Sequence, residues 1–148
     1  MPRYLPNSGL YPYLDQTNHE ITSRKSRRYN CAAWVLGLTN VHWWPDADHF
    51  WPEGVPLEAS IDAFKAAYTT VGFGDCDNGD PEDGYQKIAI YATRFESVHH
   101  VASQRPDGGW TSKMGWLGED IRHNTEKDVA GGAYHNPLAF MKRPWPNT

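Results

Sequence analysis

The sequence predicts an α+β domain in which helices come first and a small antiparallel sheet follows. Apolar residues recur at helical spacing in the first half of the chain, whereas the second half contains short runs that alternate as strands do. Helices followed by strands, rather than interleaved with them, are the order of an α+β fold. The 148 residues are enough for one such domain and too few for two ordinary ones.

Residues 1–29 are predicted to be an extended lead-in, and residues 30–148 to form the single α+β domain. The lead-in contains three prolines, a tyrosine-rich patch and the basic run Arg24–Arg28. Such a run fits either an anion site or a solvated face of the protein. It therefore indicates no function by itself.

Two helices are predicted in the first half of the domain. The first covers Asn30–Leu38, where a residue of the N-cap type immediately precedes an apolar stretch, and it places Cys31 in the first turn. An ordered loop rich in aromatic residues and proline follows over residues 40–54. The second helix is predicted over Pro56–Tyr68, because large apolar residues recur on one helical face at Leu57, Ile61, Phe64 and Tyr68.

Strands are predicted after an acidic loop at residues 75–84, which contains Cys76. The turn at Pro106–Gly109, with Asp and Gly at its centre, indicates a hairpin between two of these strands. The predicted strands are residues 87–92, 98–104, 110–114 and 138–142.

The composition excludes several classes of partner. With 14 basic and 18 acidic side chains, the net charge of −4 gives no general attraction to nucleic acid or to an anionic membrane. No apolar run resembles a membrane span or a signal peptide, so the default expectation is a cytoplasmic protein, and export by a route other than the general secretory one stays open. The two cysteines lie in unlike surroundings and are expected as free thiols. Residues 42–49 match no zinc signature, and neither a metal nor a cofactor is predicted.

Cys31 is the first candidate for chemistry. A helix N-terminus lowers the pKa of a thiol, and the thiolate is the nucleophilic form. The unpaired amides of that first turn are also suited to hold an oxyanion. The alternative is that Cys31 is a small buried core residue, as free cysteines often are.

A base for this thiol is available in the adjacent pair His99 and His100. Strand alternation places His100 with Val98, Ala102 and Gln104, and His99 on the opposite face, so only one of the pair can face Cys31. An imidazole in that place takes the thiol proton and later returns it to the leaving group. The alternative is one surface histidine and one hydrogen-bonded core histidine.

These motifs resemble two families. The helix start Tyr29-Asn-Cys-Ala-Ala-Trp34 and the later strand His100-Val-Ala102 resemble the compact papain-like cysteine hydrolases of the NlpC and CHAP type. That resemblance implies a papain-like fold in which Cys31 is the nucleophile and His100 the base. NlpC-type proteins usually have Asp where this chain has Asn30. Over most of its length the chain also resembles a family of short uncharacterised bacterial proteins, with the motif Trp110-Thr-Ser-Lys-Met-Gly115, which implies no activity.

The third catalytic group, which orients the imidazole, stays open between two candidates. Ser112 is the geometric neighbour of His100 if the hairpin is regular, and Asp120, followed by His123, is the better chemical choice if the chain folds back. Tyr29 is a candidate hydrogen-bond donor to the oxyanion. The remaining candidate substrate contacts are Trp43, Trp44, Trp51 and His99, although large aromatic residues are more often core.

The predicted function is a cysteine-dependent amide or thioester hydrolase or transferase that acts on a peptide or peptide-like substrate. Peptidase, amidase and deamidase reactions all fit this class. The alternative is a non-catalytic papain-like binding, accessory or immunity module of a bacterial system. In that case Cys31 belongs to the core, and the tryptophan-rich loop contacts a partner protein.

Overall fold

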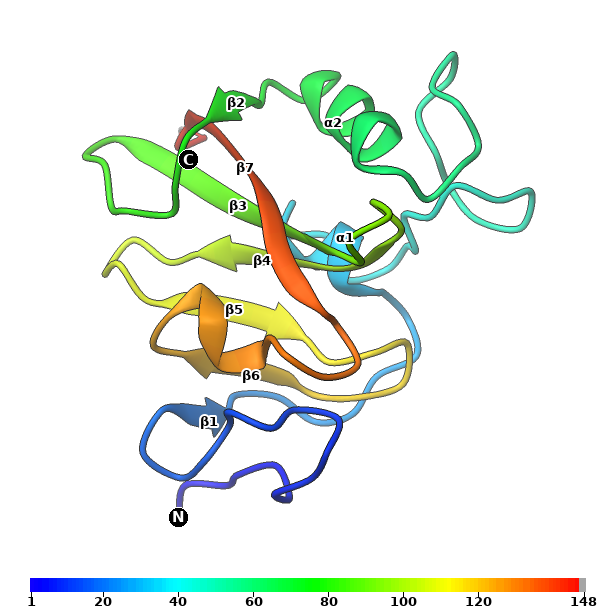
Figure 1. Cartoon of the computed structure of the whole chain (residues 1–148). Helices are drawn as coiled ribbons and strands as arrows, with labels where there is room; N and C mark the ends of the chain where they lie inside the picture. Colours follow the sequence, from blue (N-terminus) through cyan, green and yellow to red (C-terminus); the bar gives the residue numbers. More distant parts are fainter. Residues whose placement is uncertain (147–148) are drawn as a thin grey trace.

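The computed structural model describes residues 1–146, which form one seven-stranded antiparallel sheet and two α-helices (Figure 1). The chain is therefore α+β, with the sheet as its dominant part. The strand order is β1-β6-β5-β4-β3-β7-β2. The elements are β1 His19–Ile21, α1 Cys31–Trp34, α2 Ile61–Thr69, β2 Gly74–Cys76, β3 Tyr85–Ala92, β4 Val98–Gln104, β5 Trp110–Lys113, β6 Asp120–His123, the 3-10 helix η1 Glu126–Val129 and β7 Asn136–Pro144.

Helix α1 begins at Cys31, as its sequence predicts, because Asn30 caps it. The Asn30 side-chain oxygen accepts from the Ala33 amide at 3.2 Å, which satisfies one of the free amides of the first turn. The helix is shorter than the predicted Asn30–Leu38. It ends at Trp34, and Gly37 then turns the chain with a φ of 75° that L residues other than glycine rarely adopt.

Helix α2 begins later than predicted. Ser60 is extended and its hydroxyl accepts from the Ala63 amide at 3.1 Å, so the helix begins at Ile61 rather than at Pro56. Leu57 therefore lies outside the helix and its side chain is exposed. Ile61, Phe64 and Tyr68 are buried on one helical face, as their spacing predicts.

The four predicted strands are all present, and three further strands were not predicted. Strand β6 follows β5, β2 lies at the start of the predicted acidic loop, and β1 lies within the predicted lead-in, where it pairs with β6. Each has only three or four residues, which is too short for alternation to show in a sequence. The turn at Pro106–Gly109 joins β4 and β5 as a hairpin, as predicted.

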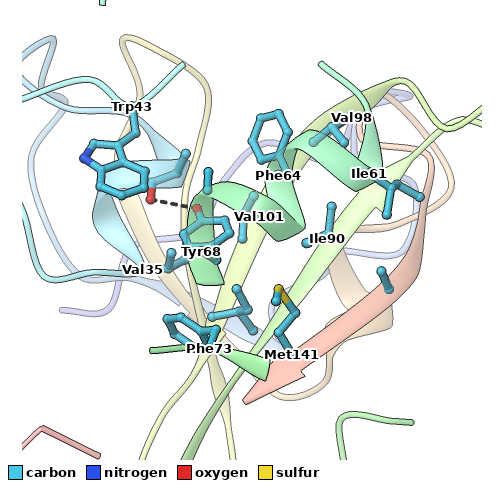
Figure 2. Packing of buried hydrophobic residues seen from close by; sticks show 14 of the residues in the cluster. Val35, Trp43, Ile61, Phe64, Tyr68, Phe73, Ile90, Val98, Val101 and Met141 are labelled. Atoms are coloured by element: carbon cyan, nitrogen blue, oxygen red, sulfur yellow. Dashed lines mark hydrogen bonds between the residues drawn. The ribbon is translucent and has the colours of Figure 1, made fainter. Parts of the chain in front are cut away.

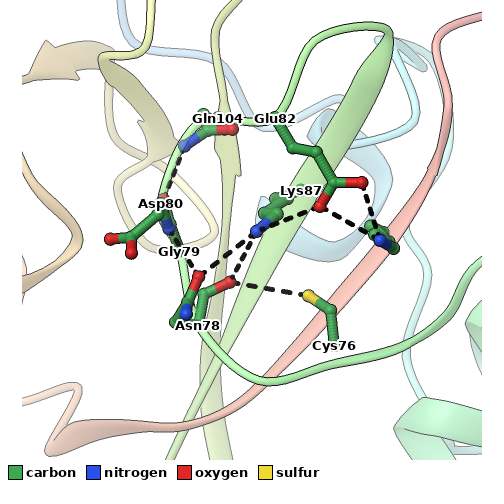
Figure 3. A network of polar contacts seen from close by, with 8 residues as sticks. Cys76, Asn78, Gly79, Asp80, Glu82, Lys87 and Gln104 are labelled. Atoms are coloured by element: carbon green, nitrogen blue, oxygen red, sulfur yellow. Dashed lines mark hydrogen bonds and ion pairs between the residues drawn. The ribbon is translucent and has the colours of Figure 1, made fainter.

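The loop that contains Cys76 is held by a buried ammonium group (Figure 3). The Nζ of Lys87 donates to the Asn78 carbonyl and to the Asn78 side chain at 3.2 and 3.3 Å, and it lies 3.8 Å from Glu82. The thiol of Cys76 donates to the same Asn78 carbonyl at 3.5 Å. Cys76 is thus part of a loop network far from the helix start.

The sheet has an apolar cluster on each face. Helices α1 and α2 pack on one face against Ile88, Ile90 and Val101 (Figure 2). The other face, with Tyr91 and Ala102, is covered by Leu14, Val129 and Tyr134 from connecting segments. In the first cluster the Tyr68 hydroxyl donates to the Ala32 carbonyl at 2.8 Å and so ties α2 to α1.

The alternation predicted for β4 holds except at its start. His100 and Ala102 lie on the Tyr91 face, as expected, but Val98 packs in the opposite cluster with Val101. The pairing of β3 with β4 shifts register between Tyr91 and Ala92, and this irregularity turns the first residue of β4 over. Among residues 1–146, no helix is long and apolar enough to cross a membrane.

Candidate active site

Cys31 lies where strands β4 and β5 separate. The registered pairs of these strands are Ser103 with Thr111 and Gln104 with Trp110, so the first part of β4 has no β5 partner. Helix α1 contacts both strands there. Cys31 is 7% exposed and forms the first residue of the helix.

Burial raises the pKa of the Cys31 thiol to about 11. The amides of Val101 and Ala32 and the positive charge of Lys113 act in the opposite direction, but less strongly than desolvation. The lowering expected from the helix N-terminus is therefore outweighed. At neutral pH the resting group is the thiol, and any nucleophilic reaction requires a base to remove its proton.

His100 is fully buried on the opposite face of β4 from the helices. Its ring stacks on the ring of Tyr134, with centroids 3.9 Å apart and planes 6° apart, and meets the edge of Tyr91 at 5.2 Å. Burial lowers its pKa well below the ordinary value, and neighbouring His123 adds to this effect. The imidazole is therefore neutral at neutral pH.

A chain of buried hydrogen bonds continues from His100. Its Nε2 lies 2.9 Å from the Ser112 hydroxyl, which lies 2.8 Å from the Nε2 of His123. The Nδ1 of His123 lies 2.8 Å from the Thr125 carbonyl oxygen. Between the two candidates for the third group, the structure brings Ser112 to His100.

The Nδ1 of His100 is buried and has no hydrogen-bond partner within residues 1–146. The Cys31 thiol and the imidazole are therefore not hydrogen-bonded to one another in this structure. Cys31 faces the amide of Val101, the residue directly after His100. Helix α1 thus contacts β4 beside His100, whereas the His100 ring packs on the other face of this strand.

Asp120 is engaged elsewhere. One of its carboxylate oxygens accepts from the Tyr29 hydroxyl at 2.7 Å, and the other, also buried, has no partner within the described residues. Burial raises the pKa of Asp120, and burial together with Asp120 raises the pKa of Tyr29 to about 12. The Tyr29 hydroxyl is consequently occupied as a donor to Asp120.

Lys113 lies between these groups and Cys31. Its ammonium is 5.2 Å from the centre of the Tyr29 ring and donates to the Gly115 carbonyl at 3.1 Å. The side chain is fully buried, and desolvation lowers its pKa, whereas Asp120 and Cys31 oppose that shift. Lys113 is therefore the cation whose charge favours the Cys31 thiolate.

The predicted aromatic contacts lie in the α2 cluster. Trp43 is buried and stacks on Tyr68 at 5.9 Å, whereas Trp44 and Trp51 meet the edge of Phe64 at 5.2 and 5.0 Å. His99 is exposed and packs against His135 at 4.7 Å. None of these four candidate side chains lines the groove described next.

An open groove of about 730 Å³ lies beside the site. The side chains of Lys25, Arg27 and Arg28 line it, and within residues 1–146 no ion pair joins them to an acidic side chain. Tyr11 and Met114, also in its lining, pack with Tyr134, the residue that covers His100. Part of the groove wall thus packs against the side chain that covers His100.

The sequence did not indicate the roles of Tyr134 and Lys113. Tyr134 lies in an irregular segment with no periodic pattern, and a lysine at a strand end is ordinarily exposed. His123 was noted only as a neighbour of Asp120, because strand β6 was not predicted. Within residues 1–146 no group of three His, Cys, Asp or Glu side chains is placed to hold a metal ion.

Fold and site define an α+β protein with a cysteine at the start of a helix. Hydrogen bonds join the buried His100, Ser112 and His123 on the face of the sheet opposite that helix. The chain belongs to the family described as a domain of unknown function, DUF7689, whose family model matches residues 20–142. This match confirms the expectation that the chain belongs to an uncharacterised family. Comparison with curated proteins and with solved structures gave no match.

Proposed function

We propose that this protein is a cysteine-dependent acyl hydrolase or transferase with a papain-like arrangement of its site, in which Cys31 is the nucleophile and His100 the base. The observation that carries the proposal is the state of His100. One ring nitrogen is held by Ser112, and the other is buried and has no partner among residues 1–146. A neutral imidazole with one nitrogen anchored and one available is the arrangement that a general base requires.

The proposed reaction requires the Cys31 sulfur and the His100 Nδ1 to approach one another, because helix α1 and the His100 ring pack on opposite faces of β4. His100 Nδ1 takes the thiol proton while the Cys31 sulfur attacks the substrate carbonyl, so a C–S bond forms and the carbonyl electron pair moves to oxygen. The oxyanion then collapses, and the leaving amine or thiol departs with the proton from Nδ1. Water, deprotonated by Nδ1, attacks the thioester, and the sulfur leaves as thiolate and regains the proton.

Backbone amides and Lys113 supply the charge stabilisation. The Ala33 amide is used by the Asn30 cap, whereas the amides of Cys31 and Ala32 face the thiol. The Lys113 charge favours negative charge on the sulfur. These groups support the thiolate and the oxyanion in a site with little water.

The proposed substrate is a peptide or peptide-like acyl compound that enters by this groove, whose wall contains three basic side chains and Glu119. Tyr11 and Met114 separate this groove from Tyr134, so small movements of these side chains must accompany access to the imidazole. No cofactor is needed for this chemistry.

Alkylation with iodoacetamide at pH 7.5 tests the proposal. We expect Cys31 to react faster than Cys76 and faster than Cys31 in the urea-unfolded chain, as followed by mass spectrometry of peptides. His100→Gln should slow Cys31, and Cys76→Ala should not. A Cys31 that reacts no faster in the folded wild type than in the unfolded chain contradicts activation.

The second candidate is a non-catalytic binding module, and the burial of Cys31 favours it. A thiol with a pKa of about 11 that makes no hydrogen bond to His100 fits a core residue. Cys31→Ala separates the two functions. A core role predicts a lower urea midpoint and unchanged binding of a partner protein, whereas the nucleophile role predicts a folded protein that no longer forms an acyl-enzyme.

A further inference from the structure

We infer that His123 is a positioning residue, which acts through Ser112 to fix the tautomer of His100 that leaves Nδ1 free for the thiol proton. This role rests on the proposed cysteine chemistry. The tautomer itself follows from the hydrogen-bond partners of three buried side chains. It is therefore measurable whether or not the protein is an enzyme.

The donor and acceptor roles along the hydrogen bonds from His100 to Ser112 and His123 are fixed at the His123 end. A carbonyl oxygen only accepts hydrogen bonds, so the Nδ1 of His123, 2.8 Å from the Thr125 carbonyl, carries a proton. His123 is buried, and burial lowers its pKa to about 4. The ring is neutral near pH 7, and its Nε2 is therefore an acceptor.

The role of His123 as an acceptor determines how the Ser112 hydroxyl is oriented. Its hydroxyl has one proton, which it donates to the Nε2 of His123 at 2.8 Å. The same oxygen then only accepts from the Nε2 of His100 at 2.9 Å, so that nitrogen carries the proton. In a neutral ring the other nitrogen, Nδ1, has the lone pair.

The tautomer of His100 determines whether this side chain can accept the Cys31 proton. With the proton on Nε2, the lone pair lies on the unpartnered Nδ1 and can receive the Cys31 proton. With the proton on Nδ1, the lone pair points to Ser112 and the base is lost. Without an acceptor at position 123, the Ser112 hydroxyl is free to donate to His100 and would favour this second form.

Nitrogen-15 NMR of the full chain, labelled in its histidines, reads the tautomers directly at pH 7. Ring signals are assigned with His100→Gln and His123→Gln. We expect His123 protonated at Nδ1, and His100 protonated at Nε2 and bare at Nδ1. A wild-type His100 protonated at Nδ1 would overturn the inference.

Variants then test the positioning role. His123→Phe removes the acceptor, whereas His123→Gln retains a side-chain oxygen that can accept from Ser112. We expect His123→Phe to move the His100 proton to Nδ1 and to slow Cys31 alkylation on the order of 10²-fold, with substantial recovery in His123→Gln. An unchanged His100 tautomer in His123→Phe overturns the role, and if that variant does not fold, the wild-type spectrum and His123→Gln decide.

His19→Phe is the matched control. His19 is also a buried histidine, pairs with His123 across β1 and β6, and bonds to the Leu5 amide and the Asp15 carbonyl. Its loss should lower stability and leave both the His100 tautomer and the Cys31 rate unchanged. A tautomer shift as large as that of His123→Phe would contradict the inference.

The tests distinguish the inference from the proposed function. The expected tautomers together with an unreactive Cys31 would reject the cysteine chemistry, and with it the positioning role, but would leave the hydrogen-bond chain in place. A reactive Cys31 together with His100 protonated at Nδ1 would reject the positioning role of His123 but not the proposed cysteine chemistry.

Discussion

Asn30 shows at the residue scale why an amide, rather than a carboxylate, is needed directly before Cys31. Its side-chain oxygen accepts from the Ala33 and Trp43 amides, and its Nδ2 donates to the Trp43 carbonyl at 2.7 Å. A carboxylate can accept but cannot donate. One side chain thus begins the Cys31 helix and anchors the aromatic loop.

Asn30→Asp is therefore expected to be costly. The change leaves the buried Trp43 carbonyl without its donor and buries a charge, at a cost of roughly 2 to 4 kcal/mol at pH 7. Urea unfolding measures the loss, which should be smaller at pH 4, where a protonated carboxyl regains a donor. Asn18→Asp, at a more exposed amide, is the control and should change stability little.

The buried histidines predict acid sensitivity. The pKa of His123 is about 4 in the folded protein and near 6.5 when unfolded, so the unfolded chain binds the proton first as the pH falls. Stability from this group is complete above pH 6.5, is lost between 6.5 and 4, and amounts to about 3 kcal/mol at 1.36 kcal/mol per pKa unit. His100 adds to this loss.

Urea midpoints measured between pH 7.5 and pH 4 check this dependence. His123→Gln should show a shallower loss than the wild type, whereas His99→Gln, at a more exposed histidine, should differ from the wild type less than His123→Gln does. Equal slopes in His123→Gln and wild type would contradict a neutral buried His123.

At the element scale, α2 fixes the position of the Cys31 helix. Four-residue helices have almost no stability of their own, so α1 depends on tertiary contacts. The Tyr68 hydroxyl supplies one of them by donating to the Ala32 carbonyl inside the apolar cluster (Figure 2).

Tyr68→Phe leaves that carbonyl buried and unpaired, and should cost about 1 to 3 kcal/mol. The circular-dichroism melting temperature measures the loss. Tyr13→Phe, at an exposed tyrosine, should leave it unchanged. Equal melting temperatures for Tyr68→Phe and wild type would show that α1 does not depend on this bond.

The loop between β2 and β3 depends on one ammonium in the same way. Lys87→Met removes the hydrogen bonds that the buried ammonium donates to Asn78 and should cost about 1 to 3 kcal/mol, as for hydrogen bonds made by a charged group (Figure 3). Lys142 also contacts Glu82, at 2.7 Å, but this pair is more exposed, so Lys142→Met should cost at most about 1 kcal/mol. Chemical denaturation compares the two, and a larger loss for Lys142→Met contradicts this ranking.

At the scale of the whole molecule, strands β3, β4, β5 and β7 were predictable, whereas the edge strands β1 and β2 and the short inner strand β6 were not. The strand over residues 98–104 is predictable with its observed bounds because the clear turn at Pro106–Gly109 follows it. The edge strands β1 and β2 are defined by pairing with distant partners, β6 and β7, which no local pattern records.

The candidate site shows the same limit. Cys31 at a helix start and His100 on a buried strand were predictable from local signals. The choice of Ser112 over Asp120 depends on the pairing of β5 with β6, which places these residues on opposite sides of the sheet. Trp43, predicted as a possible groove wall, is in the core because the loop before α2 folds back against Tyr68.

The family match has a consequence for how such proteins diversify. Residues 20–142 contain the thiol, both histidines and the serine, but two residues of the groove wall, Leu5 and Tyr11, precede them. Mutations in the first nineteen residues can therefore reshape this part of the groove wall and leave Cys31, His100, Ser112 and His123 unchanged. Under the proposed function, variation at Leu5 and Tyr11 would alter access to the site while the reacting groups stay the same.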